Sequence, residues 1–185
     1  METLIISVLV GNLIIELVLG FLNQKHILKP WPAEVRGIYT IVQLKKAVQY
    51  SQENFRFNAT SKIISTAIIV IMIVEGGFNL VNNWSVSFSE SESIQALIFI
   101  GVLMGFNQLF SIPFSYYSTF VIEERFGFNT TSKKLFILDT FKGLLIGGII
   151  GGGLLFLLGF LIESMGSYFW LLFWGVIVII MIFIN

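Results

Sequence analysis

Residues 113–129 read Pro-Phe-Ser-Tyr-Tyr-Ser-Thr-Phe-Val-Ile-Glu-Glu-Arg-Phe-Gly-Phe-Asn, and here a long apolar run meets a cluster of charges. No turn separates the stretch from the apolar run, and its aromatic side chains are of the kind that collects at membrane interfaces. Glu123, Glu124 and Arg125 follow one another, and Gly127 suits the left-handed backbone conformation that often ends a helix. The stretch predicts a helix that leaves a membrane and ends at a site facing water.

The composition of the whole chain is that of a membrane protein. Hydrophobic residues make up 56% of the sequence and charged residues 12%, whereas soluble domains carry about 25% charged residues. There is no cysteine, which excludes disulfides, thiolate nucleophiles and thiolate metal sites. The single histidine, His26, excludes a multi-histidine metal cluster and is expected at the membrane interface. The formal net charge is zero, so partners must be inferred from where the charges lie; no nucleic-acid partner is expected.

Five apolar segments approach the roughly 20 residues that a helix needs to cross a bilayer. They are residues 4–22, 63–81, 94–114, 144–162 and 168–184. The sequence therefore predicts an all-α, polytopic membrane protein, a bundle of about five transmembrane helices that forms one domain over residues 1–185.

The basic residues are distributed unevenly between the connections. Every Lys and Arg lies in or beside the first connection, 23–62, or the third, 115–142. The second and fourth connections carry only acidic charges. Because basic residues concentrate on the cytoplasmic side, the N-terminus is expected outside, and both basic connections and the C-terminus in the cytoplasm. The membrane is expected to be a bacterial inner membrane, or the endoplasmic reticulum in a eukaryote.

The first connection also predicts a helix of its own. Lys29-Pro30-Trp31-Pro32 interrupts regular structure, and from Val35 to Phe55 apolar residues recur at near-helical spacing with charges between them. This pattern indicates a cytoplasmic amphipathic helix that lies on the membrane or packs against a partner domain. Both interpretations are open, and in either case the basic side chains favour an anionic leaflet.

Two polar residues inside the apolar segments are candidates for lining a chamber. Glu16 lies near the middle of the first segment, where a carboxylate is costly and is expected to face the protein interior. It either lines a hydrated cavity or is neutral and hydrogen-bonded to a neighbouring helix. Asn107 adjoins Gln108 in the third segment, and neighbouring helical residues point about 100° apart, as the 3.6-residue turn requires. Asn107 is therefore the candidate for the cavity, and Gln108 the candidate for bridging helices.

The fourth segment is rich in glycine. Gly143, Gly147 and Gly151 are spaced by four, as are Gly148 and Gly152. Such ridges of small residues let helices approach closely, so we expect tight helix packing here.

Two stretches resemble one protein family. Ile122 to Asn129 is similar to a motif of the N-terminal membrane domain of the type I CAAX prenyl proteases, which are integral-membrane zinc metalloendopeptidases. A second stretch matches upstream. Its residues are Ile38, Tyr39, Lys46, Tyr50, Glu53, Asn54, Arg56 and Phe57.

The resemblance implies roles for particular residues. In the family the first motif lies close to the catalytic region, and the residues here that match it are Glu123, Glu124, Arg125, Gly127 and Asn129. It implies that they have a structural role at the interface with a catalytic half and transfer no proton themselves.

The residues that carry the family's chemistry are absent from this sequence. That chemistry needs His-Glu-x-x-His on a helix, whose two histidines bind zinc and whose Glu activates a water, with a further Glu as third ligand. This chain has no such motif, so no catalytic residue, metal ligand or cofactor is expected in it, although the full-length family uses zinc. The sequence looks like the N-terminal membrane domain alone, a fragment or a split gene product, and is predicted inactive by itself.

The leading hypothesis is therefore a membrane domain that anchors a CAAX prenyl protease-like enzyme and walls its intramembrane chamber. Its expected partners are the lipid bilayer, a catalytic half in cis or in trans, and prenylated or membrane-associated peptide substrates of the full-length family. The alternative is a stand-alone membrane binding or regulatory protein that holds a lipid or peptide with Glu16 and Asn107. A small channel or transporter is disfavoured, because the five segments show no inverted repeat.

Overall fold

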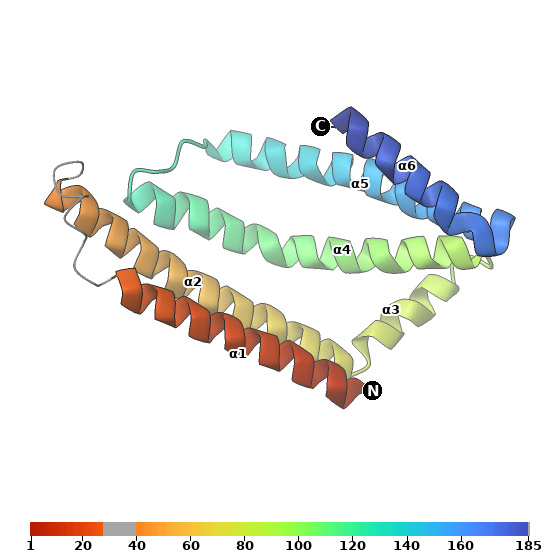
Figure 1. Cartoon of the computed structure of the whole chain (residues 1–185), viewed down its shortest axis with the longest axis horizontal. Helices are drawn as coiled ribbons and strands as arrows, with labels where there is room; N and C mark the ends of the chain where they lie inside the picture. Colours follow the sequence, from red (N-terminus) through yellow and green to blue (C-terminus); the bar gives the residue numbers. More distant parts are fainter. Residues whose placement is uncertain (28–39, 185) are drawn as a thin grey trace. The chain divides into compact units, whose positions relative to one another are not determined.

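The computed structural model of the chain describes residues 1–27 and 40–184. These residues form helices and no strand (Figure 1), which confirms the predicted all-α class. The elements in chain order are α1 (Glu2–Ile27), α2 (Ile41–Val74), α3 (Gly77–Val86), α4 (Glu92–Tyr117), the π-helix η2 (Ser118–Glu123), α5 (Lys133–Met165), the 3₁₀ turn η3 (Gly166–Tyr168) and α6 (Phe169–Ile184).

Four continuous helical stretches within the described residues are long and apolar enough to cross a membrane. They are Glu2–Ile27, Ile41–Val74, Glu92–Glu123 and Lys133–Ile182. The last contains both α5 and the 16-residue α6, so the four stretches comprise five long apolar helices within the described residues. None of the apolar residues that define the first three spans is buried inside the protein. A surface this apolar needs lipid as its solvent, which agrees with an integral membrane protein.

The chain divides into two compact units. The first comprises Met1–Gly77 with Phe110–Thr131, and the second comprises Phe78–Leu109 with Ser132–Asn185.

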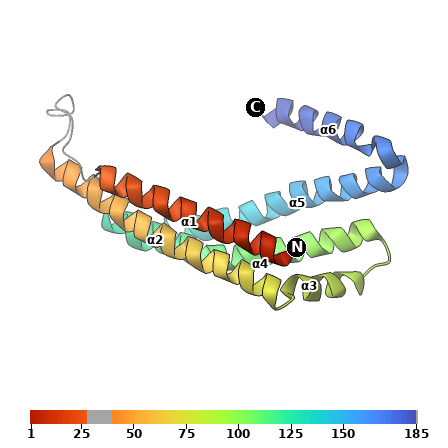
Figure 2. The same cartoon turned by 60° about the horizontal axis from the view of Figure 1, so that its bottom comes forward.

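In the first unit, α1 and α2 lie side by side and antiparallel (Figures 1 and 2). The side-chain amide of Gln24 donates to the backbone carbonyl and the hydroxyl of Ser51, at 3.2 and 3.0 Å. One turn earlier in α1, a Cβ on Gly20 would lie 2.4 Å from the ring of Phe55. Glycine is needed at this position, because any side chain would force the ring to move.

The α2 helix is longer than the sequence predicts. Thr40 and Gln43 form a capping box: the Thr40 hydroxyl accepts from the Gln43 amide, and the Gln43 side chain accepts from the Thr40 amide. From this start the helix runs without a break to Val74. The expected amphipathic helix is thus, from Ile41 onward, the first part of a membrane helix, while its Lys29–Pro32 breaker and Val35 lie outside the described residues.

The expected second span, 63–81, also ends early. Gly76 has a φ of 70°, a conformation that glycine adopts without steric cost. The chain turns there, and α3 begins at Gly77. A Gly-Gly pair does not interrupt the hydropathy of an apolar run, so the sequence predicts a longer span than the structure has.

The second unit contains α3, α4 up to Leu109, α5 and α6. The Ser93 hydroxyl donates to the Glu163 carboxylate at 2.6 Å, and a Cβ on Gly159 would lie 2.5 Å from the same serine, so the first turn of α4 contacts the last turns of α5. Gly166, with a φ of 53°, ends α5 and leads through η3 into α6.

The glycine ridges of α5 differ from the expectation of tight packing. A Cβ on Gly143, Gly147 or Gly151 would meet nothing within 4 Å. A groove of about 630 Å³ lies beside them, lined by residues of α4, Gln108 among them, and by residues of α5. Within the described residues, these ridges face open space.

Candidate functional site at the junction of α2 and η2

The stretch 113–129 folds as the end of α4, the π-helix η2 and a turn. Pro113 lies inside α4, where its missing amide hydrogen removes one helical hydrogen bond. Five residues later the helix widens into η2, and such π-segments are often found at functional sites. η2 packs against α2. Its Ile122 is 1% exposed and the following Phe126 is 7% exposed, so these two side chains anchor the stretch.

A glycine-centred turn closes this helix. The amide of Phe128 donates to the carbonyl of Glu123 at 2.9 Å, and the amide of Gly127 donates to the carbonyl of Glu124 at 3.0 Å. Gly127 has a φ of 66°, which confirms the prediction that it leaves the helix in the left-handed conformation. The turn satisfies the last carbonyls of the helix.

The charged residues of the motif are tied to defined partners. Arg125 forms an ion pair with Glu53 of α2. The Asn129 side-chain amide donates to the Glu124 carboxylate at 2.7 Å, and the Asn129 side-chain oxygen accepts from the Thr131 amide at 2.7 Å. Glu123 contributes its backbone carbonyl to the turn. These bonds fix the backbone from 123 to 131 against α2.

Aromatic contacts bind the same two segments. The Tyr50 ring meets Phe126 and Phe128 edge-on, at centroid distances of 5.4 and 4.8 Å. The ammonium of Lys46 lies 5.2 Å from the centre of the Phe128 ring. An aromatic pair contributes about 0.5–1.5 kcal/mol, whereas a half-exposed ion pair contributes about 0–1 kcal/mol. The rings therefore supply more of the junction's stability than the Glu53–Arg125 pair does.

A third set of contacts continues the junction toward the membrane. Phe57 of α2 stacks on Tyr117 at 5.2 Å and approaches Phe114 at 6.1 Å. Beside these rings an open groove of about 980 Å³ lies between α2 and the 113–126 stretch.

The two stretches that carry the family resemblance thus meet in space. Lys46, Tyr50, Glu53 and Phe57 of the upstream stretch all contact residues of 114–128, and Arg56 lines the groove beside them. Ile38 and Tyr39 lie outside the described residues. Sequence analysis missed these pairings, although the helical spacing of Lys46, Tyr50, Glu53 and Phe57 marks one face of α2.

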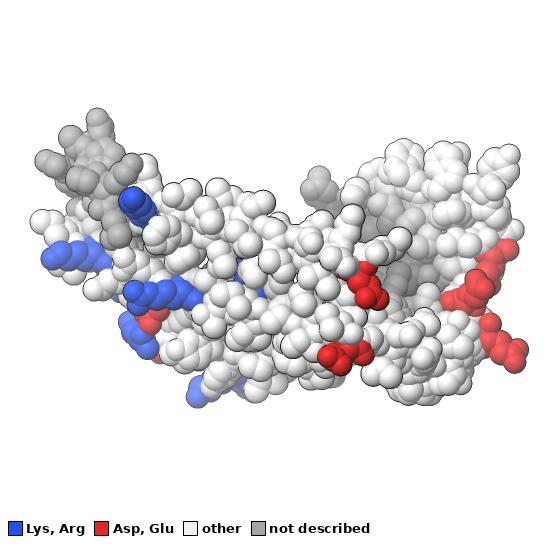
Figure 3. All heavy atoms as spheres, turned by 90° about the horizontal axis from the view of Figure 1, so that it is seen from below, with Lys and Arg blue, Asp and Glu red and all other residues white. Residues whose placement is uncertain are grey.

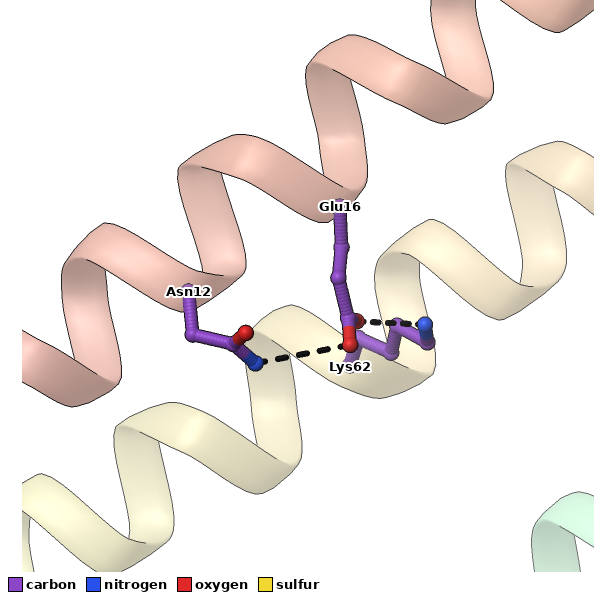
Figure 4. A network of polar contacts seen from close by, with 3 residues as sticks. All are labelled: Asn12, Glu16 and Lys62. Carbon is purple, nitrogen blue, oxygen red and sulfur yellow. Dashed lines mark hydrogen bonds and ion pairs between the residues drawn. The ribbon is translucent and has the colours of Figure 1, made fainter.

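Glu16 lies away from this junction. Its carboxylate pairs with the Lys62 ammonium of α2 at 2.5 Å, and the Asn12 amide donates to the same carboxylate at 3.4 Å (Figure 4). Lys62 was expected in a connection between spans; instead, it lies opposite the middle of α1. Asn107 is exposed on α4. A chamber-lining role for Glu16 and Asn107 stays a prediction.

The described residues do not fit a zinc site. No group of three or more His, Cys, Asp or Glu residues in the described ranges could hold a metal ion. His26 lies in the last turn of α1. The junction consists of hydrogen bonds, ion pairs and ring contacts, and this chemistry builds a rigid surface.

Comparisons with known proteins agree on one family. The family model described as CAAX prenyl protease N-terminal, five membrane helices, matches residues 4–185. Probable CAAX prenyl protease 1 of Schizosaccharomyces pombe is 30% identical over 148 residues, which are 73% of this chain and 31% of that protein. CAAX prenyl protease 1 of Saccharomyces cerevisiae is 32% identical over 122 residues, or 60% of this chain and 27% of that protein.

A solved structure is similar as well. The crystal structure of S. mikatae Ste24p matches with a TM-score of 0.87 and 29% identity, over 99% of this chain and 45% of that one. The chain therefore spans less than half the length of these relatives.

Proposed function

This chain belongs to the CAAX prenyl protease N-terminal family, and from that membership we propose that it anchors a zinc metalloprotease and walls its intramembrane chamber. The catalytic half would join it in cis or in trans and would supply the zinc ligands. Substrates would be prenylated or membrane-associated peptides.

The meeting of the two family-like stretches is the observation that carries the proposal. Residues 46–57 and 113–129 are far apart in the sequence, yet together they build one junction at the C-terminal end of α4. A surface held by an ion pair, two ring clusters and a capped turn is preorganised, which lowers the entropic cost of docking a partner. We assign the docking of the catalytic half to the turn of this junction, residues 123–129, with Arg125 and Asn129 in structural roles.

The orientation follows from charge. Basic residues at positions 45, 46, 56, 125, 133 and 134 favour the cytoplasmic side for the junction. The N-terminus would then be outside and the C-terminus cytoplasmic, which places the junction and the C-terminus on the same side. A catalytic half joined after residue 185 would begin on the junction's side of the membrane.

The test supplies a catalytic half in trans. A relative's catalytic half is co-expressed with this chain, and co-purification and peptide hydrolysis are measured. We expect the half to co-purify with the wild-type chain and with Lys133→Ala, a control that removes a basic side chain outside the junction. Arg125→Ala and Asn129→Ala should reduce both readouts. The double exchange Glu53→Arg with Arg125→Glu keeps an ion pair between the two positions. It therefore separates a loss of docking from a loss of folding.

The proposal fails if the catalytic half neither binds the wild-type chain nor depends on residues 123–129 for proteolysis.

A further inference from the structure

The groove beside the junction has an uneven charge lining. Three basic side chains, Lys46, Arg56 and Arg125, face one carboxylate, Glu53. Glu53 is already paired with Arg125. Within the described residues, neither Lys46 nor Arg56 forms an ion pair with any carboxylate. On the face drawn in Figure 3, Lys and Arg side chains gather in one region with few acidic side chains among them. The groove therefore offers two uncompensated cations to an anion.

The other half of the lining is apolar. Phe57 of α2 and Pro113, Phe114 and Tyr117 of α4 together form an apolar wall, continued by the buried Ile122 and Phe126. A small soluble anion would leave this wall without a partner. A ligand that covers both halves is an amphiphile with a negative head.

The register of α1 and α2 gives the depth of the groove. Phe55 lies against Gly20, which belongs to the apolar run of α1, so Arg56 and Thr60 lie at the level of residues that lipid surrounds. Lys46 lies ten residues before Arg56. At 1.5 Å per residue this is about 15 Å toward the N-terminal end of α2. The last residue of α1, Ile27, lies only about 10 Å beyond Gly20. The groove thus passes from the acyl region into the headgroup region.

We propose that this groove binds one anionic glycerophospholipid. Its phosphate lies near Arg56 and Arg125, the rest of its headgroup extends toward Lys46, and an acyl chain lies over Phe57 and Phe114. Basic pockets between membrane helices are suited to anionic headgroups, and the aliphatic part of the Arg56 side chain can extend along the apolar wall while its guanidinium reaches the phosphate.

The test measures lipid binding by the purified full chain in detergent, using native mass spectrometry with phosphatidylglycerol and phosphatidylcholine titrated in turn. We expect the wild-type chain to retain phosphatidylglycerol in preference to phosphatidylcholine. The variant Lys46→Gln with Arg56→Gln should bind phosphatidylglycerol about thirtyfold more weakly, because each basic side chain near an anionic lipid contributes about a factor of five. The charge-conserving variant K46R with R56K should retain binding.

The matched control is Lys45→Gln with Lys133→Gln, which removes the same charge from positions that do not line the groove. Equal retention of both lipids by the wild-type chain, or equal loss in both double variants, overturns the proposal. So does binding of soluble glycerophosphoglycerol as tightly as the lipid, since that identifies an anion site without an acyl site. The test uses no catalytic half, so its result is separate from that of the docking experiment.

Discussion

Gly127 offers a sharp test of the junction. Its backbone conformation disfavours a residue with a Cβ, while the space around it would admit one. Its φ is 66°, where an L-residue with a Cβ is strained by about 1–2 kcal/mol. A Cβ placed there would approach only the Lys46 ammonium, at 3.7 Å, which is an ordinary contact. Gly127→Ala should therefore destabilise the protein through backbone strain alone, by about 1 kcal/mol after the entropy that alanine removes from the unfolded chain.

The assay is thermal unfolding of the purified chain in detergent. For a chain of this length, about 1 kcal/mol lowers Tm by about 2–4 °C. Gly127→Asn should lose less, since asparagine tolerates the left-handed conformation. The matched control is Gly147→Ala, at a helical glycine with open space around it, which should leave Tm unchanged or raise it. If Gly127→Ala unfolds with the wild-type Tm, or if Asn is as harmful as Ala, the turn does not have the stated strain.

Three further predictions follow from the first unit and the topology. A double-mutant cycle on Glu53→Ala and Arg125→Ala should give a coupling free energy of about 0–1 kcal/mol in thermal or denaturant unfolding. A coupling above about 3 kcal/mol would mean that the pair is far more buried than its geometry indicates. Gly20→Leu should loosen the contact of α1 with α2, at a cost of about 1–3 kcal/mol, and Phe55→Ala should recover part of that loss; additive losses would contradict the close approach. Because the chain has no cysteine, single cysteines at Glu90 and Lys133 can be labelled in intact cells, where we expect the first to react and the second to stay protected; labelling at 133 from outside would refute the orientation.

Much of the fold follows from local patterns that a sequence displays. Apolar length predicted the membrane helices, and Gly127 after three charges predicted a helix stop. The bounds of the helices were harder to predict from the sequence. The charges between Ile41 and Lys62 are typical of an interfacial helix, yet the Thr40–Gln43 capping box starts one helix that continues into the membrane. At the other end of α2, Gly76 breaks a run whose hydropathy is unbroken.

The pairings between segments could not be predicted from one sequence. Lys62 follows Glu16 by 46 positions, and only the register of α1 against α2, set by Gln24 on Ser51 and Gly20 on Phe55, brings the two together. Tyr50 meets Phe126 and Phe128 because η2 and the turn that follows it pack against α2. Neither the register nor the π-segment leaves a periodic signal, so the resemblance to a family named the two stretches without showing that they touch.

Photo-crosslinking from position 130 tests the docking surface most directly. Thr130 is exposed and follows Asn129 in the turn, so a photoreactive residue there lies at the edge of the junction without replacing any of its contacts. In a complex with a catalytic half supplied in trans, we predict a crosslink to that half from position 130 and none from position 90, on the second connection. A complex that forms and hydrolyses peptide with no crosslink from position 130 would contradict the account.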